Sequence, residues 1–200
     1  MNRDAYNKVA QQWGEARSGF FKNERHYLDT LLAPLPPGST VLDLGCGTGR
    51  PMAEQVVASG HRVIGVDQSE AMLEQARRRL PDQCWLLSPM ERYVPDRDFQ
   101  AAIIWDSIFH LPRSEHAGIL QRVVERLPGG GRLMLTVGGS SHPAFTDFMF
   151  GVEFFYDSNL PEETEQILRD CGCRLLIGEF MNLPDGARNK GRYAIVAEKR

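Results

Sequence analysis

Short apolar runs recur along the chain and alternate with longer stretches in which apolar residues have helical spacing. This alternation is typical of an α/β fold in which helices cover both faces of a mostly parallel sheet. A length of 200 residues is most simply one compact unit, so we predict one domain over residues 1–200. The predicted strands are 40–44, 62–67, 84–87, 101–106, 132–137, 174–180 and 193–198.

The first apolar run contains an acidic residue, Asp43, and leads directly into three glycines at positions 45, 47 and 49. Glycines allow the backbone to turn sharply and to approach a ligand without Cβ collisions. A helix that follows such a loop points free N–H groups at it, which favours an anionic or carboxylate group there. The pattern predicts a cofactor site, and the alternative is a tight strand–helix turn without a ligand.

The spacing of the glycines separates two classes of cofactor. Dinucleotide folds use Gly-x-Gly-x-x-Gly, whereas this chain has Gly-x-Gly-x-Gly and places Arg50 where the third dinucleotide glycine would stand. The segment resembles motif I of the class I S-adenosylmethionine-dependent methyltransferases. The resemblance implies S-adenosylmethionine as cofactor and a Rossmann-like sheet of order 3-2-1-4-5-7-6 with the last strand antiparallel. The residues expected at the amino acid end of the cofactor are Asp43, Gly45, Cys46, Gly47 and Gly49.

The second predicted strand also ends in an acidic residue, Asp67. An acid at this place, one helix after the glycine loop, matches the ribose-binding carboxylate of nucleotide folds. We expect Asp67 to bind the ribose, with Gln68 beside it and Met72 as an apolar wall for the adenine. The alternative is that Asp67 or Ser69 only caps the next helix, and Met72 could equally be a core residue.

The segment after the third predicted strand departs from the resembling proteins. Those proteins have an acidic residue there that can accept the adenine amino group, whereas this chain has Pro89. Proline offers neither a side-chain acceptor nor a backbone N–H. We therefore expect Met90 and Glu91 to lie against the adenine instead.

Ligands of open α/β sheets lie beyond the carboxyl ends of the strands. At the end of the fourth predicted strand, residues 105–111 read Trp-Asp-Ser-Ile-Phe-His-Leu, which resembles a signature of a group of small bacterial methyltransferases. We expect Trp105 and Phe109 to line the pocket that holds the methyl group, because aromatic faces attract a sulfonium cation. Trp105 would contact the cofactor there and Phe109 the substrate. Core packing is the alternative for both. His110 and Asp106 are the catalytic candidates, as proton acceptors for an alcohol or amine; a soft anion would need no base.

Two flanking segments are expected to close the site. The resembling proteins fold an N-terminal segment over the cofactor, so residues 1–30 are predicted to form a helical lid in which Tyr6 and Trp13 contact the cofactor. Packing of this helix against the domain is the alternative. The second segment, residues 138–158, is rich in aromatic residues, and long connections of this kind are often functional. We expect His142 and Tyr156 there to bind the substrate, and an oligomer interface is the competing explanation.

Three basic residues precede the last predicted strand: Arg188, Lys190 and Arg192. They could approach an anionic substrate group, but we interpret them as solvated loop charges. Asp157 stands where the resembling group commonly has His, so a substrate role for that position is not carried over.

Composition narrows the choice of partners. The net charge of -3 and the pI near 6.0 show no basic excess, which disfavours a nucleic acid substrate. No apolar run approaches the roughly 20 residues of a membrane span, and we expect a cytoplasmic, bacterial protein that is a monomer or a homodimer. The four cysteines show no metal-ligand spacing, so no metal site is predicted.

The sequence thus favours an S-adenosylmethionine-dependent methyltransferase with a small-molecule acceptor, because the chain is little longer than the cofactor-binding core. Two alternatives stay open. One is a non-catalytic cofactor-binding module, and the other, disfavoured by the glycine spacing, is a nicotinamide-dependent oxidoreductase.

Overall fold

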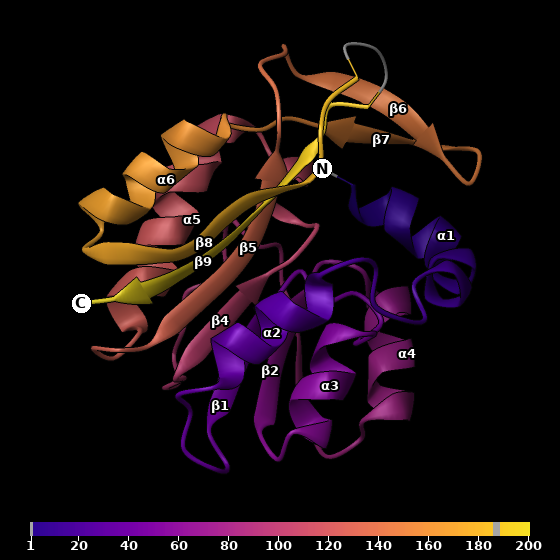
Figure 1. Cartoon of the computed structure of the whole chain (residues 1–200). Helices are drawn as coiled ribbons and strands as arrows, with labels where there is room; N and C mark the ends of the chain where they lie inside the picture. The colour runs from indigo at the N-terminus through magenta and orange to yellow at the C-terminus, as the bar shows by residue number, and fades with distance from the viewer. Residues whose placement is uncertain (1, 186–188) are drawn as a thin grey trace.

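A seven-stranded sheet forms the centre of the computed structural model, which describes residues 2–185 and 189–200 (Figure 1). Its order is β3-β2-β1-β4-β5-β9-β8, and β9 runs antiparallel to both of its neighbours. The predicted order and the antiparallel last strand are therefore confirmed. The predicted position Arg188 lies outside the described residues. The strands are β1 (Thr40–Leu44), β2 (Arg62–Asp67), β3 (Cys84–Leu87), β4 (Ala101–Ile104), β5 (Arg132–Gly138), β8 (Cys173–Asn182) and β9 (Arg192–Lys199).

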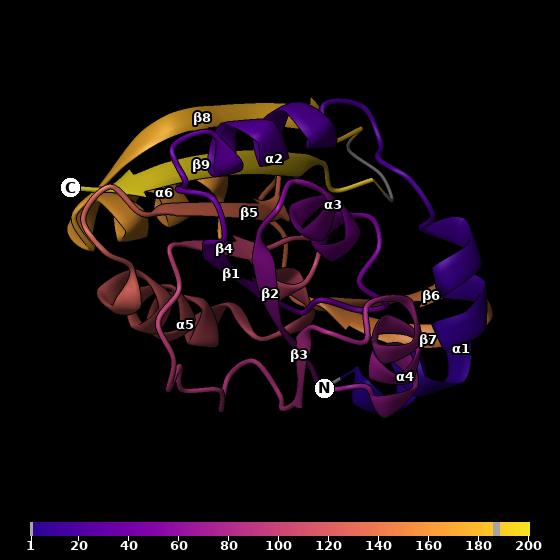
Figure 2. The same cartoon turned by 90° about the horizontal axis from the view of Figure 1, so that it is seen from below.

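Helices cover both faces of this sheet (Figure 2). Because side chains alternate along a strand, Leu42 packs in the cluster shared with α5 and α6, while Val41 packs in the cluster shared with α2, α3 and α4. None of the helices in the described part of the chain is long and apolar enough to cross a bilayer. The helices are α1 (Arg3–Ala16), α2 (Glu24–Leu32), α3 (Met52–Ala58), α4 (Glu70–Arg79), α5 (Arg113–Arg126), α6 (Pro161–Asp170) and the 3-10 turn η1 (Ile108–His110).

The fourth strand is shorter than predicted. The sequence predicted a strand over 101–106, but β4 ends at Ile104. Asp106 has a φ of 49°, which lies in the left-handed region that an extended strand cannot adopt. The chain therefore turns at this point and enters η1, which points the following side chains across the carboxyl ends of the strands.

The aromatic segment after β5 forms a structure that the sequence did not reveal. It contains an antiparallel hairpin of β6 (Phe145–Met149) and β7 (Val152–Tyr156), separate from the main sheet. The two turn residues, Phe150 and Gly151, both have positive φ, which suits the right-handed twist of a two-residue hairpin. The hairpin and helix α1 lie together beyond the carboxyl ends of the parallel strands (Figure 1).

Candidate cofactor and acceptor site

A pocket opens where the strand order reverses, between the loop after β1 and helix α1. We call it the glycine-loop pocket. Its walls come from the ends of β1, β2 and β4, from the segment after β3 and from α1. The predicted site residues that line it are Tyr6, Trp13, Asp43, Gly45, Cys46, Gly47, Asp67, Gln68, Met72, Met90, Glu91, Trp105, Asp106 and His110.

Glycine is favoured at the three loop positions for different structural reasons. A Cβ at Gly45, where φ is 86°, would lie 2.3 Å from Cβ of Ser107, so only glycine fits between β1 and the end of β4. At Gly47 the φ of 54° favours glycine, and the nearest neighbour of a Cβ would be Nε1 of Trp13 at 3.7 Å. Gly49 lies outside the pocket lining and packs near the Trp85 ring, so its cofactor role stays a prediction.

Asp43 is the buried acid of the pocket. Its residue is 3% exposed, and burial, assisted by the charge of Asp67, raises the pKa of the Asp43 carboxyl to about 7. No hydrogen bond to this carboxylate occurs among residues 2–185 and 189–200, yet its oxygens are not sealed from open space. A buried carboxylate without a partner costs free energy. It therefore fits a cationic group in the pocket, such as the ammonium at the amino acid end of S-adenosylmethionine.

Asp67 connects two loops at the bottom of the pocket. Its Oδ2 accepts a hydrogen bond from the Gly47 N–H at 2.8 Å, and its Oδ1 accepts one from the Ser69 N–H at 2.8 Å. Ser69 itself caps α4 by accepting from the Met72 N–H, as the alternative interpretation expected of it. Burial raises the pKa of Asp67. Each carboxylate oxygen keeps a further lone pair, so both could accept from vicinal hydroxyls.

The predicted adenine side is built by the segment after β3. Met90 and Glu91 both line the glycine-loop pocket, whereas Pro89 does not. The Met90 methyl group reaches the loop itself, 3.2 Å from a Cβ placed at Gly45. Oε2 of Glu91 is buried and has no hydrogen-bond partner in the described residues. Glu91 therefore brings a carboxylate to the segment in which Pro89 offers no side-chain acceptor.

Helix α1 forms a side of the pocket. The Tyr6 hydroxyl lies 2.7 Å from Nε2 of His110, and the Tyr6 and Trp13 rings meet edge to face at 5.9 Å. At the start of α1, the Asn2 side chain bonds both backbone groups of Phe155 in β7, at 2.9 Å each. The helix is thus attached to η1 and to the hairpin.

His110 has partners on both ring nitrogens. Besides Tyr6 at Nε2, its Nδ1 lies 2.8 Å from Nδ2 of Asn2 and 3.1 Å from the Phe155 carbonyl oxygen. Burial lowers the pKa of His110 to about 4, so the ring is neutral at pH 7. Its catalytic role stays a prediction.

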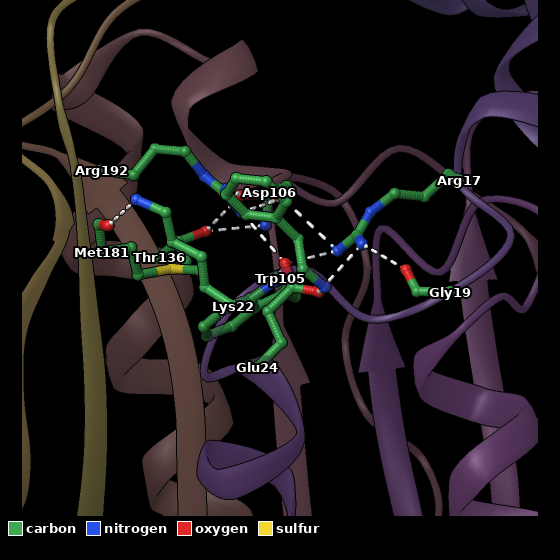
Figure 3. A network of polar contacts seen from close by, with 10 residues as sticks. Arg17, Gly19, Lys22, Glu24, Trp105, Asp106, Thr136, Met181 and Arg192 are labelled. Atoms are coloured by element: carbon green, nitrogen blue, oxygen red, sulfur yellow. Dashed lines mark hydrogen bonds and ion pairs between the residues drawn. The ribbon is translucent and has the colours of Figure 1, made fainter.

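A network of buried charges joins four elements beside the pocket (Figure 3). Glu24, at the start of α2, is fully buried. Its carboxylate accepts two hydrogen bonds from Arg17, one from Arg192 and one from Trp105 Nε1, at 2.6 to 3.2 Å. The prediction that Arg192 is a solvated loop charge is wrong, because its guanidinium is half-buried between two acids.

Asp106 is the second acid of this network. Arg192 donates to both of its oxygens, through Nε at 3.0 Å and through Nη2. The Thr136 hydroxyl also donates to Oδ1, and the Arg17 guanidinium lies 3.7 Å from Oδ2. The two carboxylates and two guanidiniums compensate one another, which is what burial of charge requires.

Two further hollows adjoin the pocket. The outer chamber lies between the α1–α2 segment and the hairpin, and Phe109, Met149 and Tyr156 are part of its wall. The hairpin pocket lies on the other side of Tyr156, and it is lined by Phe109, His142, Phe145 and Tyr156. Here the structure brings the three predicted substrate residues Phe109, His142 and Tyr156 together. Tyr156 stacks on Phe145 at 5.3 Å and on Phe109 at 6.3 Å.

Sequence reasoning missed Arg17 and Glu24. Both are charged residues in an ordinary helical context, and their partners lie up to 168 residues away. The only available signal was indirect, because the predicted strand-end acid Asp106 requires a compensating cation if it is buried. Nothing in the sequence shows which of the 23 lysines and arginines supplies it.

Comparison with known proteins agrees with this geometry. Residues 41–131 match the methyltransferase domain family. The matched region runs from β1 to the turn before β5, and so contains the glycine loop, Asp67 and the end of β4.

Two proteins named as methyltransferases are similar to the chain in sequence. The 27-O-demethylrifamycin SV methyltransferase of Amycolatopsis mediterranei is 28% identical over 66% of this chain and 55% of its own length. The trans-aconitate 2-methyltransferase of Azoarcus sp. is 36% identical over 62% of this chain and 49% of its own length. The chain therefore spans about half the length of these relatives.

Several solved structures share the fold of this chain. The magnesium protoporphyrin IX methyltransferase of Synechocystis, with bound S-adenosylmethionine, has a TM-score of 0.73 at 17% identity, covering 99% of this chain and 95% of its own. The 1,6-didemethyltoxoflavin-N1-methyltransferase of Burkholderia thailandensis, with bound substrate and S-adenosylhomocysteine, has a TM-score of 0.70 at 20% identity, covering 98% and 84%.

Proposed function

We propose that the protein is an S-adenosylmethionine-dependent methyltransferase that acts on a small-molecule acceptor. The observation that carries this proposal is Asp43, a buried carboxylate with no partner among the described residues, which faces the pocket beside Gly45 and Gly47. The match of residues 41–131 to the methyltransferase domain family supports the same function. The fold of the solved methyltransferases, some of which hold S-adenosylmethionine or S-adenosylhomocysteine, is consistent with it.

Different residues of the pocket bind the three parts of the cofactor. Asp43 and the loop Gly45–Gly47 hold the amino acid end, Asp67 with Gln68 binds the ribose, and the adenine lies between Met72 and the Met90–Glu91 segment. When bound, the cofactor supplies an electrophilic methyl group on a sulfonium. The chain's own task is then to orient an acceptor in line with that methyl group, which is the main source of rate in such a displacement.

The end of β4 separates the glycine-loop pocket from the outer chamber. Asp106 and His110 line both spaces, so they stand where cofactor and acceptor meet. Trp105 lines the pocket, and Tyr6 and Trp13 of α1 line both spaces as parts of a lid over residues 1–30. The substrates named for the relatives, such as rifamycin, aconitate and toxoflavin compounds, are small molecules.

Several finer features stay predictions. They are membership of the group with the Trp-Asp-Ser-x-Phe-His-Leu signature, a single domain, cytoplasmic location, a bacterial source, and a monomer or homodimer that binds neither nucleic acid nor membrane.

Calorimetric titration of the purified protein with S-adenosylmethionine and S-adenosylhomocysteine, with NAD as the control, tests the proposal. We expect micromolar binding of the two sulfur compounds and none of NAD. Asp67→Ala should weaken binding by about 1 to 3 kcal/mol, as expected when buried charged hydrogen bonds are lost. Asp82→Ala, which removes an exposed aspartate, is the matched control.

The outcomes separate the alternatives. Binding of NAD alone would favour an oxidoreductase. Binding of the sulfur compounds without turnover of any acceptor would leave a non-catalytic module. An unchanged affinity of Asp67→Ala would refute the ribose assignment.

A further inference from the structure

The charged network in Figure 3 indicates which class of molecule could accept the methyl group, through the hydrogen-bonding groups that it leaves unused. Building on the proposed methyltransferase function, we propose that the acceptor is an apolar or aryl carboxylate, that Arg17 and Arg192 bind this carboxylate, and that it is methylated without a general base.

The outer chamber is placed to receive such an acceptor. It shares Tyr6, Trp13, Arg17, Asp106 and His110 with the glycine-loop pocket, so a molecule in the chamber borders the cofactor site directly. Arg192 also lines the chamber, next to the shared residues Arg17 and Asp106.

The acceptor atoms of the network are already occupied. Oε1 of Glu24 accepts from Arg17, Arg192 and Trp105, and Oε2 accepts from Arg17 and from the Phe21 N–H. Glu24 is fully buried, so no ligand reaches it. A ligand that only donates hydrogen bonds therefore finds no free partner at this carboxylate.

Asp106 is similarly engaged. Oδ1 accepts from Arg192 Nε and the Thr136 hydroxyl, and Oδ2 accepts from Arg192 Nη2. The bidentate pairing with one guanidinium engages both oxygens of this carboxylate. Asp106 is thus held as the partner of Arg192 and not as a free hydrogen-bond acceptor for a ligand.

Donor atoms, in contrast, are left over. A guanidinium has five N–H groups. Among the described residues, Nε of Arg17 and Nη1 of Arg192 have no hydrogen-bond partner, and neither atom is sealed from open space. Both side chains line the outer chamber. The charges of the network balance, but its unused N–H groups belong to guanidiniums, so they favour a ligand that accepts hydrogen bonds. A carboxylate accepts such charged hydrogen bonds most strongly, and its geometry matches that of a guanidinium.

The other titratable groups of the chamber do not supply a base. Both nitrogens of His110 have partners, and burial lowers its pKa to about 4. Burial, together with the nearby Tyr156, Asp67 and Asp106, raises the pKa of Tyr6 well above 10. An acceptor that must lose a proton is therefore not served here, whereas a carboxylate is already ionised at neutral pH.

The rest of the chamber wall is apolar. Phe20, Phe109, Met149 and Tyr156 line it, together with Trp13. Aromatic walls bind large apolar or planar surfaces. The ligand class that satisfies both parts of the chamber is an apolar or aryl carboxylate.

The reaction balances without a proton transfer. A carboxylate oxygen donates a lone pair to the methyl carbon and forms the C–O bond, while the C–S bond breaks and its electron pair stays on sulfur. The negative acceptor and the positive sulfonium give a neutral methyl ester and a neutral thioether. Asp106 and Glu24 act in this scheme as positioning residues that hold the two guanidiniums.

The test compares matched ligands. The protein, saturated with S-adenosylhomocysteine, is titrated calorimetrically with benzoate, trans-cinnamate and indole-3-acetate, and with the amide of each. We expect at least one carboxylate to bind about 10- to 100-fold more tightly than its amide, the difference expected for charged hydrogen bonds. With S-adenosylmethionine, that carboxylate should give its methyl ester, with kcat/KM nearly constant from pH 6 to 9. If no carboxylate binds better than its amide, or if the rate rises tenfold per pH unit, the inference is wrong.

Variants of Arg17 test whether this residue causes the preference for a carboxylate over its amide. Arg17→Gln should lose most of the preference for the carboxylate over the amide, and Arg17→Lys should regain part of it. Arg25→Gln, at an exposed arginine of α2, is the matched control. Substitution of Arg192 is a weaker test, because it removes one of the two cations that compensate Glu24 and Asp106 and so threatens folding.

The test also separates the two proposals. Failure of the wild type to bind S-adenosylhomocysteine would contradict the proposed function. Normal binding of S-adenosylhomocysteine with an unchanged carboxylate preference in Arg17→Gln would contradict only the assignment of the acceptor.

Discussion

At the scale of single residues, Asp43 places function and stability in opposition. Its buried carboxylate suits a cationic ligand but has no partner among the described residues of the unliganded protein. A carboxyl whose pKa is raised on folding contributes stability below its unfolded pKa, and this stability is lost as the pH rises to the folded value. For Asp43 the loss falls between about pH 4 and pH 7.

Asp43→Asn is therefore expected to stabilise the unliganded protein at high pH. Relative to wild type, its free energy of unfolding should rise by about 1 to 2 kcal/mol more at pH 8 than at pH 5.5, because one pKa unit corresponds to about 1.4 kcal/mol. Urea unfolding at the two pH values measures this. The same variant should bind S-adenosylmethionine more weakly, because an amide does not compensate an ammonium charge. Asp82→Asn is the control, and an equal change in both variants would contradict the prediction.

Residues whose role is set by their neighbours in sequence were predictable. Asp43 lies near the end of an apolar strand before the glycines, Asp67 ends an apolar strand before a helix start, and the pattern alone placed both at the pocket. Glu24 was not predictable, because its partners Arg192 and Trp105 are 168 and 81 residues away. The ion pairs that surround it depend on the packing of α2 against the end of β4 and on β9, which no local pattern contains.

At the scale of elements, the helices and strands of the main sheet followed from apolar periodicity, and the hairpin β6–β7 did not. Its turn, Phe150-Gly151, lacks the Asn-Gly or Asp-Gly pair that usually marks a two-residue hairpin. Its strands also present aromatic residues on both faces because one side adjoins the outer chamber. The segment was therefore recognised as functional in character but not as a sheet.

Helix α1 depends on the hairpin for its position. Asn2, which is 4% exposed, bonds both backbone groups of Phe155 and contacts His110. Asn2→Ala should leave those backbone groups unpaired and release the start of α1. We expect amide hydrogen exchange within residues 3–16 to accelerate about 5-fold or more, as when a buried hydrogen bond of about 1 kcal/mol or more is lost.

Gln12→Ala, at an exposed position of the same helix, is the control for this measurement. Saturation with S-adenosylhomocysteine should restore part of the protection in Asn2→Ala, because Tyr6 and Trp13 would then contact the ligand. Equal exchange rates in wild type and Asn2→Ala would show that the hairpin does not hold the helix.

At the scale of the whole molecule, the glycine-loop pocket assembles only in the folded chain. Its walls come from α1, three strand ends and the segment after β3. S-adenosylhomocysteine at about 100 times its Kd should therefore stabilise the protein by about 2.7 kcal/mol, which raises the Tm of a chain of this size by about 5 to 10 °C. Differential scanning fluorimetry checks this, with NAD as the control. Equal shifts with both compounds would point to nonspecific stabilisation.

The strand order of the sheet also has a consequence for biosynthesis. Arg192 lies on β9, which is made after β8 but inserted between β5 and β8. A nascent chain that has emerged only through β8 still lacks one of the two cations shared by Glu24 and Asp106, so α2 and the end of β4 cannot bury these acids fully. The outer chamber is therefore completed only when β9 has emerged, and ribosome-bound intermediates that lack β9 should display its acidic wall to solvent.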